Sequence, residues 1–469
     1  MEPGEEPTEA GRGPTGLRRL VSPRSWSRPV RFVLTGLLVL VVAAAMGVTA
    51  YRTLKPAETV SPAQKPVPSP EPIKAIQYAE LPSAPLIVEG RLRVYAEQWR
   101  VFADTPVTAQ RENTPHWSYR RWPAEVVSVV VVEKAAVGVS LSLVITKWSD
   151  GDVVALDAEK GDIVWQTKIT PADGESFKGR RTGAKTMWAP EDLFVTASTV
   201  DRQPVVIVTG KDLAEGIDAA NGTVRWTRSY AAEPGCRASD WTGTDAYFVK
   251  NTCAKPATLE IYDSASGVLL NTWRPPGASL GSDKVSNWFV EPSSCQLGWS
   301  GCLMFKAAPT GEGVVTYADA ASGLGTITPA YWSLGADHVV QPEPVAEKDT
   351  VVAVGDVVAQ QVTGGYIWAF SRQTGQRLWM SEVAGRLIGG DQRNMYLINA
   401  EYQLLVLNLE TGAVTSSTEL RIRPADKFVY SQYYLHSGYL VIERLQTTKE
   451  SEIDDRYYFS MDTVVLVGI

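Results

Sequence analysis

The sequence predicts an all-β fold, a β-propeller built from four-stranded blades. Three observations lead to this prediction: one short phrase recurs six times between Ala155 and Ser416, the segments between the copies read as short strands, and long amphipathic helical patterns are missing. The turn glycines of the six copies are on average about 50 residues apart, which suits one four-stranded blade. Six copies, with further strand-like segments after Phe428, favour seven blades, and eight is the alternative.

Each copy of the phrase reads as a β-hairpin. A hydrophobic strand leads into a short polar residue, a glycine follows four residues later, and three copies have a tryptophan four residues after the glycine. The polar side chain can bond the turn backbone, and glycine supplies the positive φ that closes it. The predicted turn residues are Asp157, Gly161, Asp218, Gly222, Asp263, Gly267, Asp319, Gly323, Ser371, Gly375, Asn408 and Gly412. We interpret Trp165, Trp226 and Trp379 as residues that pack neighbouring blades together.

The N-terminal region differs from the rest of the chain. Twenty consecutive uncharged residues lie between Arg31 and Arg52, about the length of a helix that crosses a bilayer. We therefore predict a cytoplasmic tail over residues 1–31, a transmembrane helix over 32–51, a Pro-rich linker over 52–75 and an extracytoplasmic propeller over 76–469. Six arginines in the tail place it inside by the positive-inside rule. A cleavable signal peptide is the alternative, but its apolar region would run only about 7 to 15 residues.

The predicted linker carries six prolines between Pro56 and Pro72. Such a segment cannot build a packed core, and in extended polyproline form it would reach about 50 Å. We expect it to act as a spacer. We also expect residues 86–96 to complete the C-terminal blade, because a closed propeller ties its first and last strands together.

The charge of the outer region argues against nucleic acid as a partner. Removing the six basic and four acidic residues of the tail from totals of 45 and 52 leaves a net charge of −9. Nucleic-acid binding depends on positive charge that neutralises phosphates. The expected partners are therefore the membrane and a protein of the cell envelope.

All four cysteines, Cys236, Cys253, Cys295 and Cys302, lie in this outer region as two local pairs. Outside the cytoplasm such pairs indicate disulfides. Of the three connectivities that four cysteines allow, we expect sequential pairing, because each pair brackets a short turn or hairpin. A zinc site is the alternative, although no histidine lies near either pair and the spacings differ from those of zinc modules.

The phrase resembles the repeat of the pyrroloquinoline-quinone-like propeller family, A-x-D-x-x-T-G-x-x-x-W. Ala155, Asp157, Gly161 and Trp165 match it, with partial matches around Gly222 and Gly375. The resemblance spans about residues 126–420 and implies the fold, whereas the family contains both quinoprotein dehydrogenases and BamB-like binding propellers. The dehydrogenases would need quinone and calcium held by acidic and amide side chains, often beside vicinal cysteines or a C-x-x-C-H haem segment. Neither of these two motifs occurs in the sequence.

Candidates for catalysis are weak. The three histidines, His116, His338 and His436, form no metal or general-base pattern. Ser279 lies in a G-x-S-x-G sequence but follows two prolines in a loop, whereas a nucleophile elbow needs a strand and a helix. The acidic segment 449–456 lacks the spacing of an EF-hand loop, and we interpret it as a solvated hairpin tip. We therefore expect no catalytic, cofactor-binding or metal-binding residues.

The segment from His116 to Trp122 is the most suggestive surface for a partner. It interleaves aromatic and arginine side chains, the residue types that anchor protein interfaces. The predicted contact residues are Trp117, Tyr119, Arg120, Arg121 and Trp122. Packing over the propeller is the alternative. Taken together, the sequence predicts a membrane-anchored, non-catalytic binding or scaffold propeller for envelope assembly or secretion, with a quinoprotein-like oxidoreductase as the alternative.

Overall fold

The computed structural model describes residues 27–110, 114–134, 140–178, 187, 190–196, 203–230, 236–254, 257–275, 288–309, 316–319, 323–326, 330–334, 339–340, 350–362, 365–420, 428–446 and 464–469. The chain divides into two compact units, Met1–Pro56 and Ala57–Ile469. Ser279 and the acidic segment 449–456 lie outside the described residues.

The first unit contains a single helix, α1 (Arg28–Leu54), with a proline in its first turn. Proline suits this place because the first backbone N–H groups of a helix have no partner within it. The stretch Arg28–Tyr51 has a mean hydropathy of 2.5 and no buried residue. By length and composition α1 can cross a membrane.

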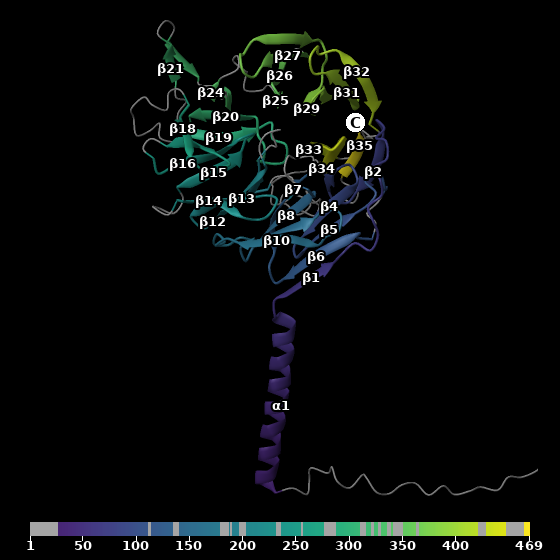
Figure 1. Ribbon diagram of the computed structural model, residues 1–469, viewed down its shortest axis with the longest axis vertical. Helices are drawn as coiled ribbons and strands as arrows, with labels where there is room; N and C mark the ends of the chain where they lie inside the picture. Colours follow the sequence, from purple (N-terminus) through teal and green to yellow (C-terminus); the bar gives the residue numbers. More distant parts are fainter. Residues whose placement is uncertain are drawn as a thin grey trace, which may run out of the picture. The chain divides into compact units, whose positions relative to one another are not determined.

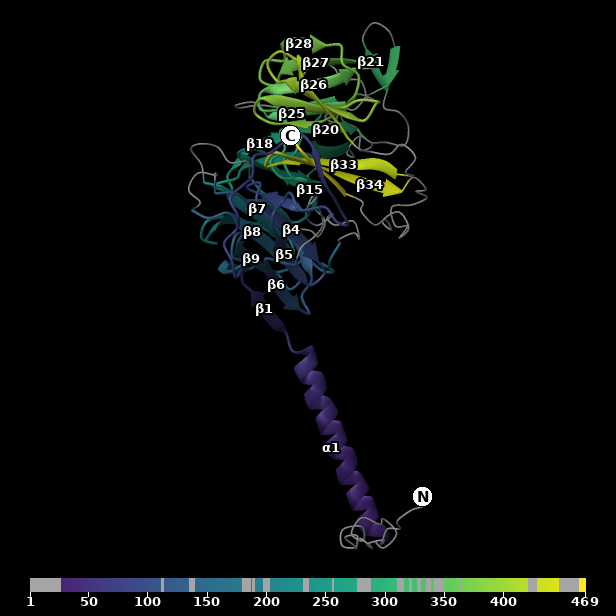
Figure 2. The ribbon, with the colours of Figure 1, turned by 90° about the vertical axis from the view of Figure 1, so that its right-hand side faces the viewer.

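The second unit is all-β, and its sheets follow one another around a ring (Figures 1 and 2). The first sheet has the order β1 (Ala57–Ser61), β6 (Trp117–Trp122), β5 (Arg100–Asp104), β4 (Leu92–Glu97) and β3 (Leu86–Val88). The second consists of β7 (Val126–Val132), β8 (Leu143–Trp148), β9 (Asp152–Asp157) and β10 (Ile163–Lys168). The third consists of β11 (Leu193–Val195), β12 (Val205–Gly210), β13 (Leu213–Asp218) and β14 (Val224–Ser229). The fourth consists of β15 (Arg237–Thr242), β16 (Ala246–Asn251), β17 (Thr258–Asp263) and β18 (Leu269–Trp273).

Four further sheets complete the ring. The fifth consists of β19 (Trp288–Ser293), β20 (Met304–Pro309), β23 (Ala330–Leu334) and β24 (Val339–Val340), with a separate hairpin of β21 (Thr316–Asp319) and β22 (Gly323–Thr326). The sixth consists of β25 (Thr350–Val354), β26 (Val357–Val362), β27 (Tyr366–Ser371) and β28 (Arg377–Ser381). The seventh consists of β29 (Arg386–Gly390), β30 (Asn394–Ile398), β31 (Gln403–Asn408) and β32 (Val414–Glu419). The eighth has the order β2 (Gln77–Leu81), β35 (Val464–Gly468), β34 (Tyr439–Gln446) and β33 (Phe428–His436).

The described residues thus form eight sheets of four or five strands, which matches the alternative count of eight rather than the favoured seven. The repeat phrase missed the first and last sheets because neither contains a full copy of it. Strands nearest the ring centre are apolar along their whole length, as β7 illustrates with seven buried residues. A strand covered on both faces reads as such a continuous apolar run.

Neighbouring sheets pack through these inner strands. Contacts join β7 to β11, β11 to β15, β15 to β19, β25 to β29, β29 to β33, and β33 to β3. The fifth and sixth sheets meet where Met304 packs against Val351 and where the Ala353 amide donates to Ser294 Oγ over 2.8 Å. The ring is therefore continuous from sheet to sheet.

The closing strand differs from the expected one. β2 pairs antiparallel with β35 and completes the last sheet, whereas residues 86–96 contain β3 and β4 of the first sheet. All three residues of β3 are buried, as an inner strand requires, while β2 alternates in burial towards its end, as suits a sheet edge. The sequence identified the need for closure but assigned it to the wrong strand.

Part of the expected spacer belongs to the propeller. β1 pairs antiparallel with β6 from Ala57 opposite Trp122 to Ser61 opposite Ser118. Downstream, Ala63 and Val67 pack against the core that contains the first sheet, and the Ala63 amide donates to the Lys160 carbonyl over 2.9 Å. Residues 57–67 are thus bound to the propeller, because β1 satisfies the backbone groups at the outer edge of β6.

Candidate functional site

The repeat phrases build contacts between consecutive sheets. In each of four pairs, the indole Nε1–H of a tryptophan in one sheet donates to a carbonyl in the hairpin turn of the next sheet, over 2.7 to 2.9 Å. The pairs are Trp117 with Ala158, Trp165 with Ala219, Trp226 with Ser264, and Trp379 with Leu409. The acceptor always directly follows the polar turn residue of the phrase.

The turn glycine of the next sheet lies under the same indole. A Cβ atom on Gly222 would lie 2.7 Å from the Trp165 ring, and one on Gly412 would lie 2.4 Å from the Trp379 ring. Distances this short leave no room for a side chain. Gly375 makes an informative contrast, since nothing lies within 4 Å of the same position. The phrase therefore couples sheets only where the preceding sheet supplies a tryptophan.

The polar turn residues accept backbone hydrogen bonds within their own hairpins. Asp157 Oδ1 accepts from the amides of Glu159 and Lys160 over 2.8 and 3.1 Å, and Asn408 Oδ1 accepts in the same way from Glu410 and Thr411. The corresponding acceptors in three other turns are Asp218, Asp263 and Ser371. In the remaining copy, β21 ends at Asp319 and β22 begins at Gly323, while the turn between them lies outside the described residues.

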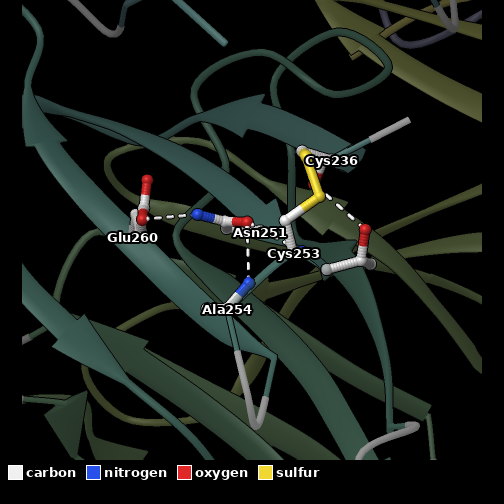
Figure 3. Close-up of a disulfide and its surroundings, with 6 residues drawn as sticks. Cys236, Asn251, Cys253, Ala254 and Glu260 are labelled. Atoms are coloured by element: carbon white, nitrogen blue, oxygen red, sulfur yellow. Dashed lines mark hydrogen bonds between the residues drawn. A yellow bond between two sulfur atoms is a disulfide. The ribbon is translucent and has the colours of Figure 1, made fainter. Parts of the chain in front are cut away.

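Both expected disulfides are confirmed. Cys236 pairs with Cys253, whose amide donates to Asn251 Oδ1 over 3.0 Å. Figure 3 shows the Asn251 side chain next to this disulfide, and its amide group also donates to Glu260 over 2.8 Å. This disulfide joins the start of β15 to the end of β16, so it lies within the fourth sheet.

The second disulfide, Cys295–Cys302, closes a loop between β19 and β20. The loop is bonded to two other sheets. Thr242 at the end of β15 donates its amide to the Trp299 carbonyl over 3.0 Å and accepts from the Cys302 amide over 2.7 Å. Ser300 Oγ accepts from the Val195 amide of β11 over 3.1 Å. We call residues 295–302 the disulfide loop.

The disulfide loop reaches across the ring. Leu297 is buried in a hydrophobic cluster with residues of the first, second and eighth sheets, among them Leu86, Val131 and Leu466. The loop itself belongs to the fifth sheet, so Leu297 contacts sheets from the other side of the ring. Trp299 packs instead with Phe194 and Tyr247 of the third and fourth sheets. The loop therefore fills part of the ring centre.

A cavity of about 1260 Å³ occupies the rest of the centre. Its walls come from the inner strands β25, β29 and β33, from the disulfide loop, and from the ends of β7 and β11. Valine, leucine and tyrosine side chains line most of it. The acidic residues on its walls are Glu133, Asp356 and Asp391, which belong to the second, sixth and seventh sheets.

Each of these carboxylates is bound by donors from nearby turns. Asp356 accepts from Ser371 Oγ over 2.9 Å and from a backbone amide. Asp391 accepts two backbone amides of its own turn and the Tyr396 hydroxyl. Burial raises the pKa of Asp391, but these hydrogen bonds, with that of Tyr396 foremost, lower it more strongly.

Glu133 is held by three sheets at once. Its Oε1 accepts from Ser437 Oγ over 2.5 Å and from the Glu89 amide over 2.7 Å, and it lies 3.3 Å from His436 Nε2. Burial raises the pKa of this carboxyl, whereas the nearby His436 imidazole and these hydrogen bonds outweigh burial and lower the pKa to about 2. Glu133 therefore links the second sheet to the first and the eighth.

This donor set does not fit quinone with calcium. A calcium site needs about six to eight oxygen ligands that converge on one point. The three carboxylates of the cavity come from separate sheets and are bound by turn donors, and the described residues contain no group of three or more His, Cys, Asp or Glu side chains that could hold a metal ion. Cys295 and Cys302 are not vicinal. No catalytic step through such a cofactor can be derived from these residues.

The predicted partner segment is split by the structure. Trp117 and Tyr119 are fully buried, so they are packing residues and the expectation that they contact a partner is wrong. Alternate side chains of a strand point to opposite faces, and these two face the second sheet, where Tyr119 meets Trp148 edge to face. His116 lies beside Trp117, and its ring nitrogen is 3.2 Å from the Glu159 carbonyl.

The two arginines of the segment differ in the same way. Arg121 donates to both carboxylate oxygens of Asp150 over 3.1 and 3.0 Å and also contacts Asp152, so it joins the first and second sheets. Arg120 is exposed on the other face of β6. Trp122 is half-buried and meets Trp99 edge to face, with ring centroids 5.0 Å apart. Arg120 and Trp122 remain the candidates for partner contact.

Sequence reasoning missed two features of the site. Trp99 and Arg100 join Arg120 only through strand pairing that spans twenty residues of sequence, so no local motif marks them. The role of the disulfide loop was missed as well, although its two cysteines, two glycines and tryptophan within eight residues signal an unusual, constrained loop.

Comparisons with known proteins agree with the fold. Residues 74–268 match the model of a family described as outer membrane protein assembly factor BamB. BamB from Moraxella catarrhalis is 14% identical, with 85% of this chain and 98% of that chain covered and a TM-score of 0.41. The computationally designed Ika8 protein is 12% identical, with 84% and 100% covered and a TM-score of 0.39. The C-terminal WD40 domain of Sif2 is 11% identical, with 86% and 98% covered and a TM-score of 0.38. No curated protein matches the sequence.

Proposed function

We propose that this chain, a β-propeller whose repeats are of the PQQ-like, BamB-like type, is a single-pass membrane protein that presents a non-catalytic binding module outside the cytoplasm. The observation that carries the proposal is the disulfide loop. It binds the third and fourth sheets and buries Leu297 against the first, second and eighth, in the part of a propeller where a quinone enzyme would hold its cofactor. The centre is thereby used for structure, which leaves the outer surfaces for binding.

The membrane topology is part of the proposal. An N-terminal cytoplasmic tail, a retained α1 and an extracytoplasmic propeller are consistent with the six arginines before the apolar stretch, with the hydropathy of α1 and with two disulfides in the second unit. Disulfides persist outside the reducing cytoplasm. A signal peptide would instead release the propeller from the membrane.

The proposed partner is a protein of the cell envelope. The family description names outer membrane protein assembly, and the proposal takes from it only the coarser role of a scaffold for protein assembly or secretion in the envelope. Within this role, Arg120 and Trp122 are the proposed contact residues of the original segment, because they are accessible while Trp117 and Tyr119 are not.

Crosslinking in membranes tests the proposal. Cells that produce the full-length chain are treated with a chemical crosslinker, and the chain is purified from the membrane fraction. We expect a discrete envelope protein that is absent when residues 1–56 are fused to an unrelated soluble domain. Recovery of the same proteins from both would contradict the proposal. Adding pyrroloquinoline quinone and calcium should leave the absorbance of the quinone unshifted, and a red shift with dye-linked dehydrogenase activity would favour the oxidoreductase instead.

A further inference from the structure

We propose that an acidic segment of the protein partner docks on the exposed surface formed by Trp99, Arg100, Arg120 and Trp122, which we call the arginine–tryptophan patch. The inference rests on the proposed function and deepens it, because it specifies where the partner binds and which charge it carries. All four residues belong to the first sheet, near the edge where β5, β6 and β1 lie side by side (Figure 1).

The patch contains two arginines in direct opposition. β5 and β6 pair so that Arg100 lies opposite Arg120, and directly opposite side chains share one face of a sheet. Like charges in this arrangement destabilise an antiparallel pair. The sheet therefore carries a repulsion that a bound anion would relieve.

Only one of these charges is compensated. Arg100 donates two hydrogen bonds to Glu97, over 3.1 and 2.8 Å, and its guanidinium carbon lies 4.3 Å from the centre of the Phe102 ring. Arg120 is exposed, and no carboxylate pairs with it within the part of the chain that the structure describes. The neighbouring Arg121, in contrast, is paired with Asp150 and Asp152. Arg120 is thus a positive charge available to a partner on a propeller whose overall charge is negative.

The tryptophans make the patch rigid. Trp99 and Trp122 are half-buried and meet edge to face, and the Trp99 carbonyl accepts a hydrogen bond from the Arg121 amide over 3.1 Å. The hairpin that carries Trp99 is thereby fixed to β6. Tryptophan and arginine are the residue types enriched at interface positions that contribute most to affinity. A rigid aromatic pair also costs little conformational entropy on binding.

The adjoining strand leaves room for an extended segment. β1 is the outer strand of this sheet, and its small residues Ala57 and Thr59 lie opposite Trp122 and Arg120. The outer edge of β1 can accept main-chain pairing from an added strand. Charge complementarity to Arg120, together with this edge, favours an extended acidic protein segment over other anions.

A binding experiment with a defined acidic probe tests the inference. The full-length chain is placed in phosphatidylcholine nanodiscs and titrated with a fluorescein-labelled oligoglutamate, with anisotropy as the readout. We expect binding that weakens as salt is added, and at least fivefold weaker binding by Arg120→Glu. The new carboxylate would face Arg100, so the melting temperature of the variant should not fall. Arg377→Glu, at an exposed arginine of β28, serves as the matched control and should bind within twofold of the original chain.

Three results would overturn the inference. The first is no binding of oligoglutamate by the original chain, and the second is equal weakening by Arg120→Glu and Arg377→Glu. The third is slower amide exchange in β6 when phosphatidylglycerol replaces phosphatidylcholine, without any effect of oligoglutamate, which would assign the patch to lipid. If the envelope protein is still crosslinked to Arg120→Glu, the proposed function stands and only the docking surface is wrong.

Discussion

At the scale of single residues, the propeller depends on an indole that packs on a glycine in the next sheet. The hairpin part of the phrase could be predicted, because Asp, Gly and the strand residues act within about ten positions of one another. The docking of Trp165 onto Gly222 could not, because it joins residues 57 positions apart and requires the ring to be assembled. The same limit explains Trp117, which lies outside any phrase yet docks on Gly161.

Substituting two turn glycines by alanine separates indole packing from backbone strain. Gly412 and Gly375 have φ of +71° and +70°, so alanine is strained equally at both. Only Gly412 lies under an indole, at 2.4 Å from the added Cβ. We expect Gly412→Ala to lower the free energy of unfolding by about 1 to 3 kcal/mol more than Gly375→Ala, the usual cost of overpacking. Urea unfolding of the two variants measures the difference, and equal losses would contradict the account.

Acid should weaken the contact that Glu133 makes with three sheets. The folded-state pKa of this carboxyl is about 2, below its ordinary value of 4.5. A lowered pKa gives stability that is fully present above pH 4.5 and is lost as pH falls towards 2. Melting temperatures of the original chain and Glu133→Gln should therefore differ most above pH 4.5 and converge towards pH 2. A difference that does not change with pH would show that Glu133 makes no such contribution.

At the scale of elements, the disulfide loop determines how the ring centre is filled. Its cysteine pairing could be predicted from local spacing, since the two cysteines bracket six residues. Its position could not, because the contacts of Leu297 and Ser300 are with sheets formed more than 90 residues earlier in the chain. The number of sheets failed for a related reason. The first and eighth sheets are built from segments that lack the phrase, and the eighth combines β2 with β33, β34 and β35 from the far end of the chain.

Removing the loop's disulfide should loosen contacts in other sheets. In Cys295→Ser/Cys302→Ser, we expect faster amide exchange at Val195, Thr242 and Cys302→Ser itself, whose amides bond within or to the loop. The lost cross-link of a short loop corresponds to about 2 to 3 kcal/mol.

The other disulfide provides the control. Cys236→Ser/Cys253→Ser should alter exchange around β15 and β16 and leave Val195 unchanged, because that pair lies within the fourth sheet. If Val195 exchanges equally fast in both double variants, the loop is not held in place by its own disulfide.

At the scale of the whole molecule, closure of the ring depends on a segment near the first unit. β1 and β2 lie within 25 residues of each other in the chain, yet one covers the edge of the first sheet and the other completes the eighth. Prolines suggested an unbound spacer, because composition alone cannot show that an extended segment has a sheet edge to pair with. A single hydrophobic cluster joins both sheets and includes Leu81 of β2.

Truncating the closing strand should therefore destabilise two sheets at once. Leu81 is fully buried, so Leu81→Ala should lower the free energy of unfolding by about 2 to 5 kcal/mol and speed amide exchange in both the first and eighth sheets. Leu378→Ala, at a residue of β28 that is 49% exposed, is the control and should change stability by less than about 0.5 kcal/mol. Loss of protection in the eighth sheet alone would contradict a shared closure.

Site-specific photo-crosslinking in membranes tests the central claim most directly, namely that a protein partner docks on the arginine–tryptophan patch. A photoreactive amino acid replaces Thr59, which lies opposite Arg120 and leaves the patch itself intact, and a second version carries it at Arg377 as the control. We predict an adduct with one envelope protein from position 59, absent from position 377 and lost when Arg120→Glu is added. The same adduct from both positions, or none from position 59, would contradict the claim.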